Sequence, residues 1–142
     1  MIEDLILTPL NIIDTSGGNV LHALKNTDFG YAGFSEAYFS EINSGSIKAW
    51  KQHKEMTLNI VVPIGEIKFV IFDNRVDNSG VFQEVFLSEK NYHRLTVPPM
   101  VWLGFQGIAT NKSLLLNIAN IVHDPQEVNK KDINDIKYNW SN

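Results

Sequence analysis

The side chains best suited to acid–base chemistry lie in one short segment, residues 47–54, which has the sequence IKAWKQHK. In an extended strand, alternate side chains point to the same face, so Lys51 and His53 share a face with Ile47 and Ala49. If this face lines the mouth of a barrel, burial lowers the pKa of the lysine. The two residues would then be suited to act as acid and base.

The opposite register of the same strand is also open. In that register Lys48, Trp50 and Gln52 point inward, and Lys51 is simply solvated. The alternation of the strand does not choose between the two faces.

Metal and cysteine chemistry find little support. The chain has no cysteine, which excludes disulfides, thiolate catalysis and Cys-ligated metals. A histidine metal site in a barrel needs two histidines one residue apart and a third on a later strand. Here Lys51 precedes His53, and a protonated lysine is a poor ligand. We therefore expect no metal, and we interpret His22 and His93 as bystanders.

Short strands separated by turns must position these side chains. Runs of β-branched and aromatic residues, spaced about ten residues apart, favour an antiparallel sandwich or barrel. Only residues 124–136 have a helical pattern, with Asp124 as N-cap and Pro125 at the first helical position. Gly104, inside the run VWLGF, indicates a bend or a close approach of backbone or ligand. We predict strands at 58–64, 67–73, 81–87, 92–97, 101–108 and 114–122, with weaker candidates at 5–12, 20–24, 35–42 and 46–52.

Length and composition fit a single cytoplasmic domain over residues 1–142. No apolar stretch reaches the roughly 18–20 residues that span a bilayer. The net charge of −4, with scattered Lys and Arg, argues against nucleic acid as a partner. The N-terminal sequence lacks the basic region of a signal peptide, and the absence of cysteine fits a reducing compartment. We expect neither membrane nor nucleic-acid contacts.

Residues 87–105 resemble a family motif. Their sequence, LSEKNYHRLTVPPMVWLGF, is similar to the pattern LS-x-x-N-x-x-x-L-x-[IV]-P-x-x-x-x-H-G-F of the dTDP-4-dehydrorhamnose 3,5-epimerases. Gly65-Glu66 and Asp73-Asn74-Arg75 resemble the "GE" turn and the "D-x-R" strand end of the same family. The resemblance implies an all-β fold, a cupin-type double-stranded β-helix (jelly-roll) barrel with a short C-terminal helical segment. The matching residues are Leu87, Ser88, Asn91, Leu95, Val97, Pro98, Gly104 and Phe105.

The resemblance also implies proton transfer beside a ketone. In the family, a histidine steadied by an aspartate removes protons from a 4-keto sugar linked to a nucleotide diphosphate. A tyrosine on the opposite face returns the proton, and positive groups hold the pyrophosphate. The ketone itself stabilises the carbanion as an enolate, so no metal or organic cofactor is implied. Homodimers are usual in the family.

Several positions depart from the family pattern. Lys51 stands at the base histidine, Ile121 or Val122 at the acid tyrosine, and Leu103 at the histidine before G-F. Asp135 is retained and could pair with Lys51. These changes affect the chemistry more than the scaffold.

A second resemblance places the same two residues in the site. The sugar-nucleotide 3,4-ketoisomerases carry R-G-x-H-x-H-K in the corresponding strand, and His53 and Lys54 match the end of that pattern. Lys51 again replaces the first histidine. Both resemblances therefore favour a pocket-facing Lys51 and His53.

We predict a catalytic set and a substrate-binding set from these patterns. His123 would supply the missing acid if the register of its strand shifts by one residue. Trp50 and Trp102 are candidates for stacking on the nucleoside base, although buried aromatics in a barrel are usually core. Arg75 is a candidate phosphate contact or, alternatively, closes a turn. The predicted catalytic residues are Lys51, His53, Asp135 and His123, and the predicted substrate contacts are Lys48, Trp50, Arg75 and Trp102.

Two functions follow from this sequence. The first is an epimerase or ketoisomerase that acts on a nucleotide-linked 4-keto-6-deoxy sugar in deoxysugar and polysaccharide biosynthesis. The second is a non-catalytic cupin that binds a sugar nucleotide or serves as an accessory protein. The missing tyrosine and the apolar Leu103 and Ile121 favour the second.

Overall fold

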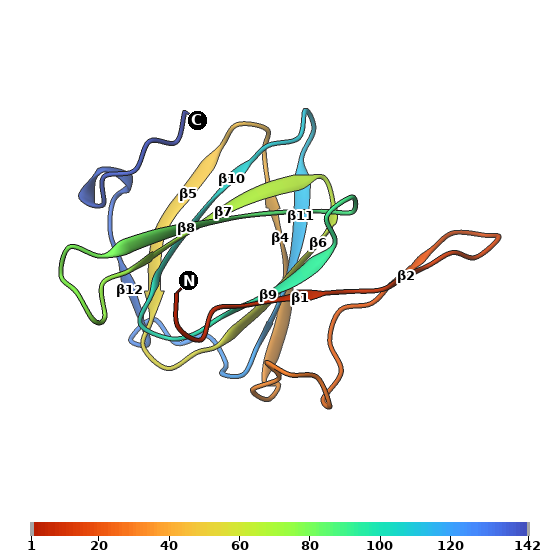
Figure 1. Cartoon of the computed structure of the whole chain (residues 1–142), viewed down its shortest axis with the longest axis horizontal. Helices are drawn as coiled ribbons and strands as arrows, with labels where there is room; N and C mark the ends of the chain where they lie inside the picture. Colours follow the sequence, from red (N-terminus) through yellow and green to blue (C-terminus); the bar gives the residue numbers. More distant parts are fainter. Residues whose placement is uncertain (1, 142) are drawn as a thin grey trace.

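The computed structural model describes residues 2–141, which form two facing five-stranded sheets and a small hairpin (Figure 1). All strand pairs are antiparallel. The first sheet contains β1 (Ile6–Pro9), β9 (His93–Val97), β6 (Leu58–Ile64), β11 (Ser113–Ala119) and β4 (Glu36–Ile42), in that order. The second contains β12 (Val128–Lys130), β5 (Ile47–His53), β10 (Trp102–Gly107), β7 (Glu66–Asp73) and β8 (Val81–Ser88), in that order.

The observed strands confirm the all-β prediction. β6 has the predicted bounds, and the turn into β7 needs Gly65, whose φ is +83°. A Cβ at Gly65 would lie 2.2 Å from the side-chain oxygen of Ser113, so no other residue fits this turn without a shift. This tight turn joins an inner strand of the first sheet to an inner strand of the second.

The helix predicted over residues 124–136 is wrong in its extent. The segment forms the short strand β12 and a single 3-10 turn, η1 (Ile133–Asp135). β12 pairs with β5 through Val128 opposite His53 and Lys130 opposite Lys51. Pairing with the edge of the second sheet has overridden the local helical signal, as tertiary contacts commonly do.

The main core lies between the two sheets. On β7, alternate residues Ile67, Phe69 and Ile71 join this core, and they are fully buried. The intervening Val70 faces the other way and packs in a second cluster with Trp50, Trp102, Ile136 and Trp140. Residues 131–141 therefore cover part of the outer face of the second sheet, whereas Phe82 and Phe86 on β8 remain exposed.

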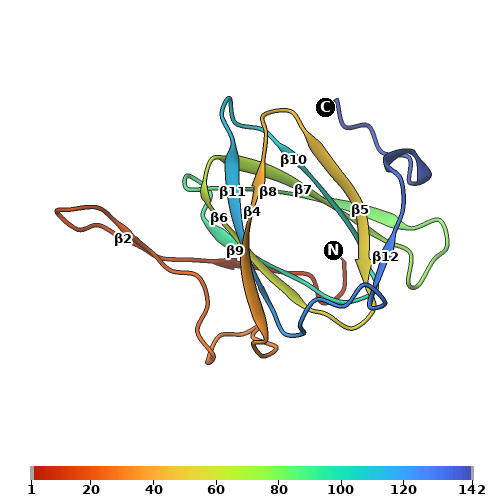
Figure 2. The same ribbon diagram turned by 180° about the vertical axis from the view of Figure 1, so that it is seen from behind.

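The remaining strands, β2 (Ile12–Ile13) and β3 (Val20–Leu21), form a hairpin that extends away from both sheets in two opposite views (Figure 1, Figure 2). Ile13 and Val20 on this hairpin are exposed. Within residues 2–141, no helix is long and apolar enough to cross a membrane.

Candidate active site

A cavity of about 1010 Å³ lies between the sheets, beside β4 and β5. Its apolar floor belongs to the main core and includes Leu58, Ile60 and Leu115. Its rim is polar and charged. The polar lining residues are Glu36, Tyr38, Ser40, Lys48, Lys51, His53, Asn117, His123, Lys130, Lys131, Asp132 and Asp135.

The register of β5 against β10 decides which side chains of β5 reach the cavity. Lys51 lies opposite Leu103 and Lys48 lies opposite Phe105, so two residues of β5 between these pairs face a single residue of β10. This bulge breaks the alternation, and both lysines line the cavity together with His53. The two registers considered from the sequence are thus combined, because the predicted inward face gains Lys48.

The prediction that Ile47 shares the face of Lys51 is wrong for the same reason. Ile47 lies opposite Gln106 and packs against the outer cluster around Trp50. Gly104 sits at the bulge, where a Cβ would lie 2.8 Å from the Cβ of Ala49 and 3.0 Å from the ring of Trp140. Gly104 therefore allows a close approach of backbone and side chains, as the sequence indicated.

Lys51 has an unusual electrostatic setting. The Lys51 side chain is exposed at the rim of the cavity, and its partial desolvation, the charge of Lys130 and the charge of Lys48 all lower the pKa of Lys51 below its usual value. Lys130 is the direct cross-strand partner of Lys51 on β12. A lysine with a lowered pKa carries more of its neutral amine near neutral pH, so Lys51 is suited to act as a base or a nucleophile.

His53 is held by a buried carboxylate that the sequence analysis missed. Its Nδ1 lies 2.6 Å from Oε1 of Glu127, whose side chain is 7% exposed. The other carboxylate oxygen accepts hydrogen bonds from the backbone amides of Glu55 and Met56, at 2.9 and 2.8 Å. The carboxylate thus fixes the ring so that Nε2 is left for the substrate.

The ionisation of Glu127 follows from these contacts. Burial raises the pKa of Glu127, but the hydrogen bonds from His53 and the two backbone amides outweigh it, and the net pKa lies below the usual range. Glu127 is 74 residues from His53 in a segment with a helical pattern. No sequence signal pairs the two; only the β5–β12 register does.

The opposite wall carries a tyrosine that the sequence analysis also missed. Tyr38, on β4, lines the cavity, and its hydroxyl accepts a hydrogen bond of 3.2 Å from the amide of buried Asn117. The hydroxyl's own hydrogen remains available to the cavity. An inward-pointing tyrosine on this strand could have been suspected from the alternation of residues 36–42 alone.

His123 also lines the cavity, although β11 ends at Ala119. It reaches the rim from the loop after β11, so the predicted one-residue shift of a strand is not what places it there. The backbone amide of His123 donates to the carboxylate of Glu36, at 3.0 Å. Of the two residues at the family's tyrosine position, Ile121 packs on the main core and Val122 is exposed.

Asp135 lines the cavity but is not paired with Lys51. Its carboxylate accepts a hydrogen bond of 2.8 Å from the backbone amide of Asp132, at the start of the 3-10 turn. Among residues 2–141, no carboxylate oxygen lies within 4 Å of the Lys51 amine. The proposed Lys51–Asp135 pair is therefore absent from this part of the chain.

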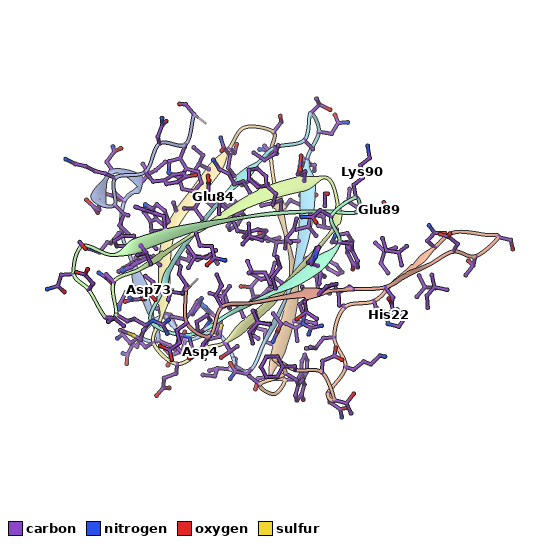
Figure 3. The ribbon with its side chains drawn as sticks, viewed as in Figure 1. Asp4, His22, Asp73, Glu84, Glu89 and Lys90 are labelled. Carbon is purple, nitrogen blue, oxygen red and sulfur yellow. The ribbon has the colours of Figure 1, made fainter. Side chains whose placement is uncertain are left out.

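Arg75 closes a turn and does not line the cavity. Its guanidinium donates to both carboxylate oxygens of Asp73, at 2.9 and 3.0 Å, and to the backbone oxygen of Glu3, at 2.7 Å. These hydrogen bonds hold the pKa of Asp73 below its usual range. Figure 3 labels Asp73 at the end of β7 and Asp4 in the nearby N-terminal segment. Arg75 belongs to this corner of the barrel, which corrects its prediction as a phosphate contact.

The two tryptophans are core residues. Trp50 is 1% exposed, and its indole N–H donates to the backbone oxygen of Ile133, at 3.2 Å. Trp102 faces the outer side of the second sheet, where the Lys131 amine lies 5.2 Å from its ring centre. The Trp102 ring lies outside the cavity, which corrects its prediction as a stacking contact, whereas Trp50 lines the cavity and its predicted substrate contact stays a prediction. Among residues 2–141, no group of three His, Asp or Glu is arranged to hold a metal ion.

The chain is similar to known proteins over most of its length. The crystal structure of a dTDP sugar isomerase from Desulfovibrio desulfuricans G20 is 35% identical, with a TM-score of 0.92, and the match covers 98% of this chain and 92% of that one. A dTDP-4-dehydrorhamnose 3,5-epimerase from Sulfolobus tokodaii shares the fold, with a TM-score of 0.80 and 22% identity over 94% of this chain and 80% of that one.

A curated relative comes from Haloferax volcanii, where it is described as a probable low-salt glycan biosynthesis epimerase. It is 29% identical over 100 residues, which are 68% of this chain. The match spans 64% of the relative's own length. No protein-family profile matches the sequence.

Proposed function

Because this chain belongs to the cupin family of dTDP-4-dehydrorhamnose 3,5-epimerases and related dTDP-sugar isomerases, we propose that it moves protons beside the ketone of a nucleotide-linked 4-keto-6-deoxy sugar. The reaction would serve glycan biosynthesis, as the Haloferax volcanii relative is described to do. The observation that carries the proposal is the His53–Glu127 pair, which shares one cavity with Lys51 and faces Tyr38.

The geometry suits removal of a proton on one side and its return on the other. A ketone at C4 makes the neighbouring C–H groups acidic, because the resulting charge spreads onto the oxygen. His53, oriented by Glu127, is the proposed base on the wall formed by β5. Tyr38 or His123, from β4 and the loop after β11, is the proposed acid on the facing wall. Epimerisation requires such groups on two faces of the sugar.

Lysines provide the proposed contacts to the diphosphate. Lys48 and Lys130 line the cavity beside Lys51, in a chain whose net charge is −4. The Lys48 amine donates to the backbone oxygen of Glu41, at 2.7 Å, which holds it at the β4–β5 side of the cavity. A local concentration of cations in an acidic protein favours an anionic ligand at this place. The proposed partner is therefore a nucleotide-diphosphate sugar.

The test is proton exchange in deuterated water. The protein is incubated with dTDP-4-keto-6-deoxyglucose, and the sugar protons are followed by NMR. We expect deuterium at C3 or C5, lost in His53→Gln and retained in Lys112→Met, whose side chain is exposed and paired with Glu41. The products separate an epimerase from a 3,4-ketoisomerase.

Binding without exchange would overturn the enzyme and favour the accessory cupin. One observation supports that alternative: Leu103 lines the cavity at the position where the family motif has the histidine before G-F. Isothermal titration with dTDP provides the binding measurement. Absence of both exchange and binding would reduce the resemblance to one of fold.

A homodimer is proposed as well, because the outer face of β4 and β11, at one edge of the first sheet, carries exposed apolar side chains. Phe39 is 65% exposed on edge strand β4, and it lies opposite Leu116 on β11. Ile118, two residues further on, shares that face, and Phe34, in the segment before β4, is also exposed. Exposed apolar patches of this kind mark protein interfaces. Light scattering should give a dimer for the natural chain and a monomer for Phe39→Glu.

A cytoplasmic location is proposed on composition. The chain has no cysteine, which suits a reducing compartment. Fractionation of cells that produce the untagged protein would test it.

A further inference from the structure

Lys51 differs from Lys48, Lys54 and Lys112 in lacking a hydrogen-bond or ion-pair partner within residues 2–141, a feature that it shares with Lys130. The amine of Lys48 donates to a backbone oxygen, as does that of Lys54, and Lys112 pairs with the carboxylate of Glu41. Lys51, in the described part of the chain, has neither a carboxylate within 4 Å nor a hydrogen bond from its amine. Two like charges act on it instead, those of Lys48 and of Lys130, which lies directly across from it on β12, while Glu36, Asp132 and Asp135 line the same cavity without pairing with it.

The cavity around Lys51 is partly apolar. Leu103 lies opposite it on β10, and Ile60 and Leu115 line the floor. Partial desolvation together with the charges of Lys130 and Lys48 lowers the pKa of Lys51. Both conditions, an apolar pocket and a cationic neighbour, are known to turn a lysine into a nucleophile toward carbonyl groups.

We propose that Lys51 attacks the substrate ketone and forms a covalent imine with it. This inference rests on the proposed function, because it requires a keto sugar in the cavity. The nitrogen lone pair forms a C–N bond to C4, and the C=O π electrons move to the oxygen. The oxygen then takes up two protons, which balance those that the amine loses, and leaves as water. No oxidant, reductant or cofactor is needed.

The imine makes the later proton transfer easier. A protonated imine withdraws electrons more strongly than a ketone, so the adjacent C–H proton is more acidic. His53 lines the same cavity two residues beyond Lys51, and Glu127 orients it to take that proton. The electron pair of the broken C–H bond forms a C=C bond, and the C=N π electrons move to the nitrogen, which gives an enamine. Reprotonation and hydrolysis by water restore the ketone and the free amine.

The inference also explains the altered position. In the family resemblance, Lys51 stands where a histidine acts as the base. Lys51 is not needed as the base, because His53, paired with the buried carboxylate of Glu127, can take the proton instead. The pair then divides the work: Lys51 activates the carbonyl carbon, and His53 moves the proton.

The experiment is reductive trapping. The full chain is incubated with dTDP-4-keto-6-deoxyglucose and sodium cyanoborohydride near pH 7, where this reagent reduces imines faster than ketones. We expect the intact mass to rise by the mass of the substrate less one oxygen atom, and peptide mapping to place the adduct on Lys51. Lys51→Arg keeps the charge but cannot form an imine, so it should give no adduct. Lys112→Met is the matched control and should trap as the natural chain does.

The outcomes separate this inference from the proposed function. Deuterium exchange without a trapped adduct overturns the imine and leaves the proton-transfer function standing. An adduct on Lys130 or Lys48 in place of Lys51 also overturns it. Binding of the sugar nucleotide with neither exchange nor adduct overturns both. An adduct on Lys51 whose half-maximal trapping moves to higher pH in Lys130→Met supports both the covalent step and its electrostatic cause.

Discussion

Lys51 and Lys68 lie in the same sheet but on opposite faces, and their surroundings differ in kind. Lys68, on β7, is completely buried, and its amine lies 3.6 Å from the carboxylate of Glu84 and 5.1 Å from the ring centre of Tyr138 (Figure 3 labels Glu84). Lys51 faces the cavity with two other lysines beside it. A charge met by a carboxylate and aromatic rings is a structural element. A lysine beside other lysines loses its proton more easily, because like charges lower its pKa. The two faces of one sheet thus hold a structural lysine and one suited to reaction.

The largest expected effect is on catalysis, from removal of the Lys51 amine. Lys51→Met removes the amine from the cavity and should lower the exchange rate by about 100-fold or more, the scale of a lost acid–base or covalent group. NMR exchange measures the rate, and circular dichroism checks that the fold persists. A variant that keeps more than half the activity would contradict any catalytic role for Lys51.

Glu127→Gln should come next in size. Loss of the carboxylate releases the His53 ring from its fixed orientation, so we expect a fall in exchange of about 10–100-fold. The change should appear in kcat more than in KM. Glu55→Gln is the matched control, because its backbone amide alone contacts the site.

Glu127 also predicts a pH dependence of stability. Its pKa is lower in the folded chain than in the unfolded chain, so it contributes stability above about pH 4.5, and this is lost as the pH falls through the folded value. In Glu127→Gln the stability should vary less between pH 5 and pH 3. Denaturant titrations across that range test the sign, and an unchanged slope would contradict it.

Lys68→Ala tests the structural side of the comparison. Removing this side chain leaves a cavity under Tyr138 and Trp140, and we expect a loss of about 2–4 kcal/mol in the free energy of unfolding. The pH profile of exchange should not move, since Lys68 faces away from the cavity. A shifted profile with unchanged stability would reverse the roles assigned to the two lysines.

The smallest expected effect is a shift, not a loss. Lys130→Met removes a positive charge opposite Lys51 and should raise the pKa of Lys51. Activity that depends on the neutral amine rises with pH, so its rising limb should move to higher pH, by about one unit or less. Lys137→Met, outside the lining of the cavity, should leave the limb where it is.

The sequence predicts the fold better than it predicts the site. The strand patterns predicted both ends of β6 correctly and the ends of the other long strands to within three residues. They could do so because alternation and turn residues are local signals. It also predicted that Lys51 and His53 would face the pocket. The bulge at Ala49 and Trp50, which brings in Lys48, depends on a register between two strands fifty residues apart. Such a register has no local signature.

The partner of His53 shows the same limit more sharply. Glu127 lies in a segment with helical signals, and only its docking beside β5 brings the carboxylate to the ring. Asp135, the acidic residue that the family resemblance indicated, instead closes a 3-10 turn. Where a role depends on tertiary pairing, a motif names the type of residue needed but not which residue supplies it.

The segment from Glu127 to Trp140 has a consequence for heat inactivation. It supplies Lys130 to the cavity and Glu127 to the His53 ring, and it docks at the edge of the second sheet through β12, two backbone hydrogen bonds between Lys131 and Trp50, and the rings around Trp50. Segments at a sheet edge and near a chain end open at lower free energy than the central strands. On warming, this protein should therefore lose its catalytic arrangement while the barrel is still intact, and recover it on cooling.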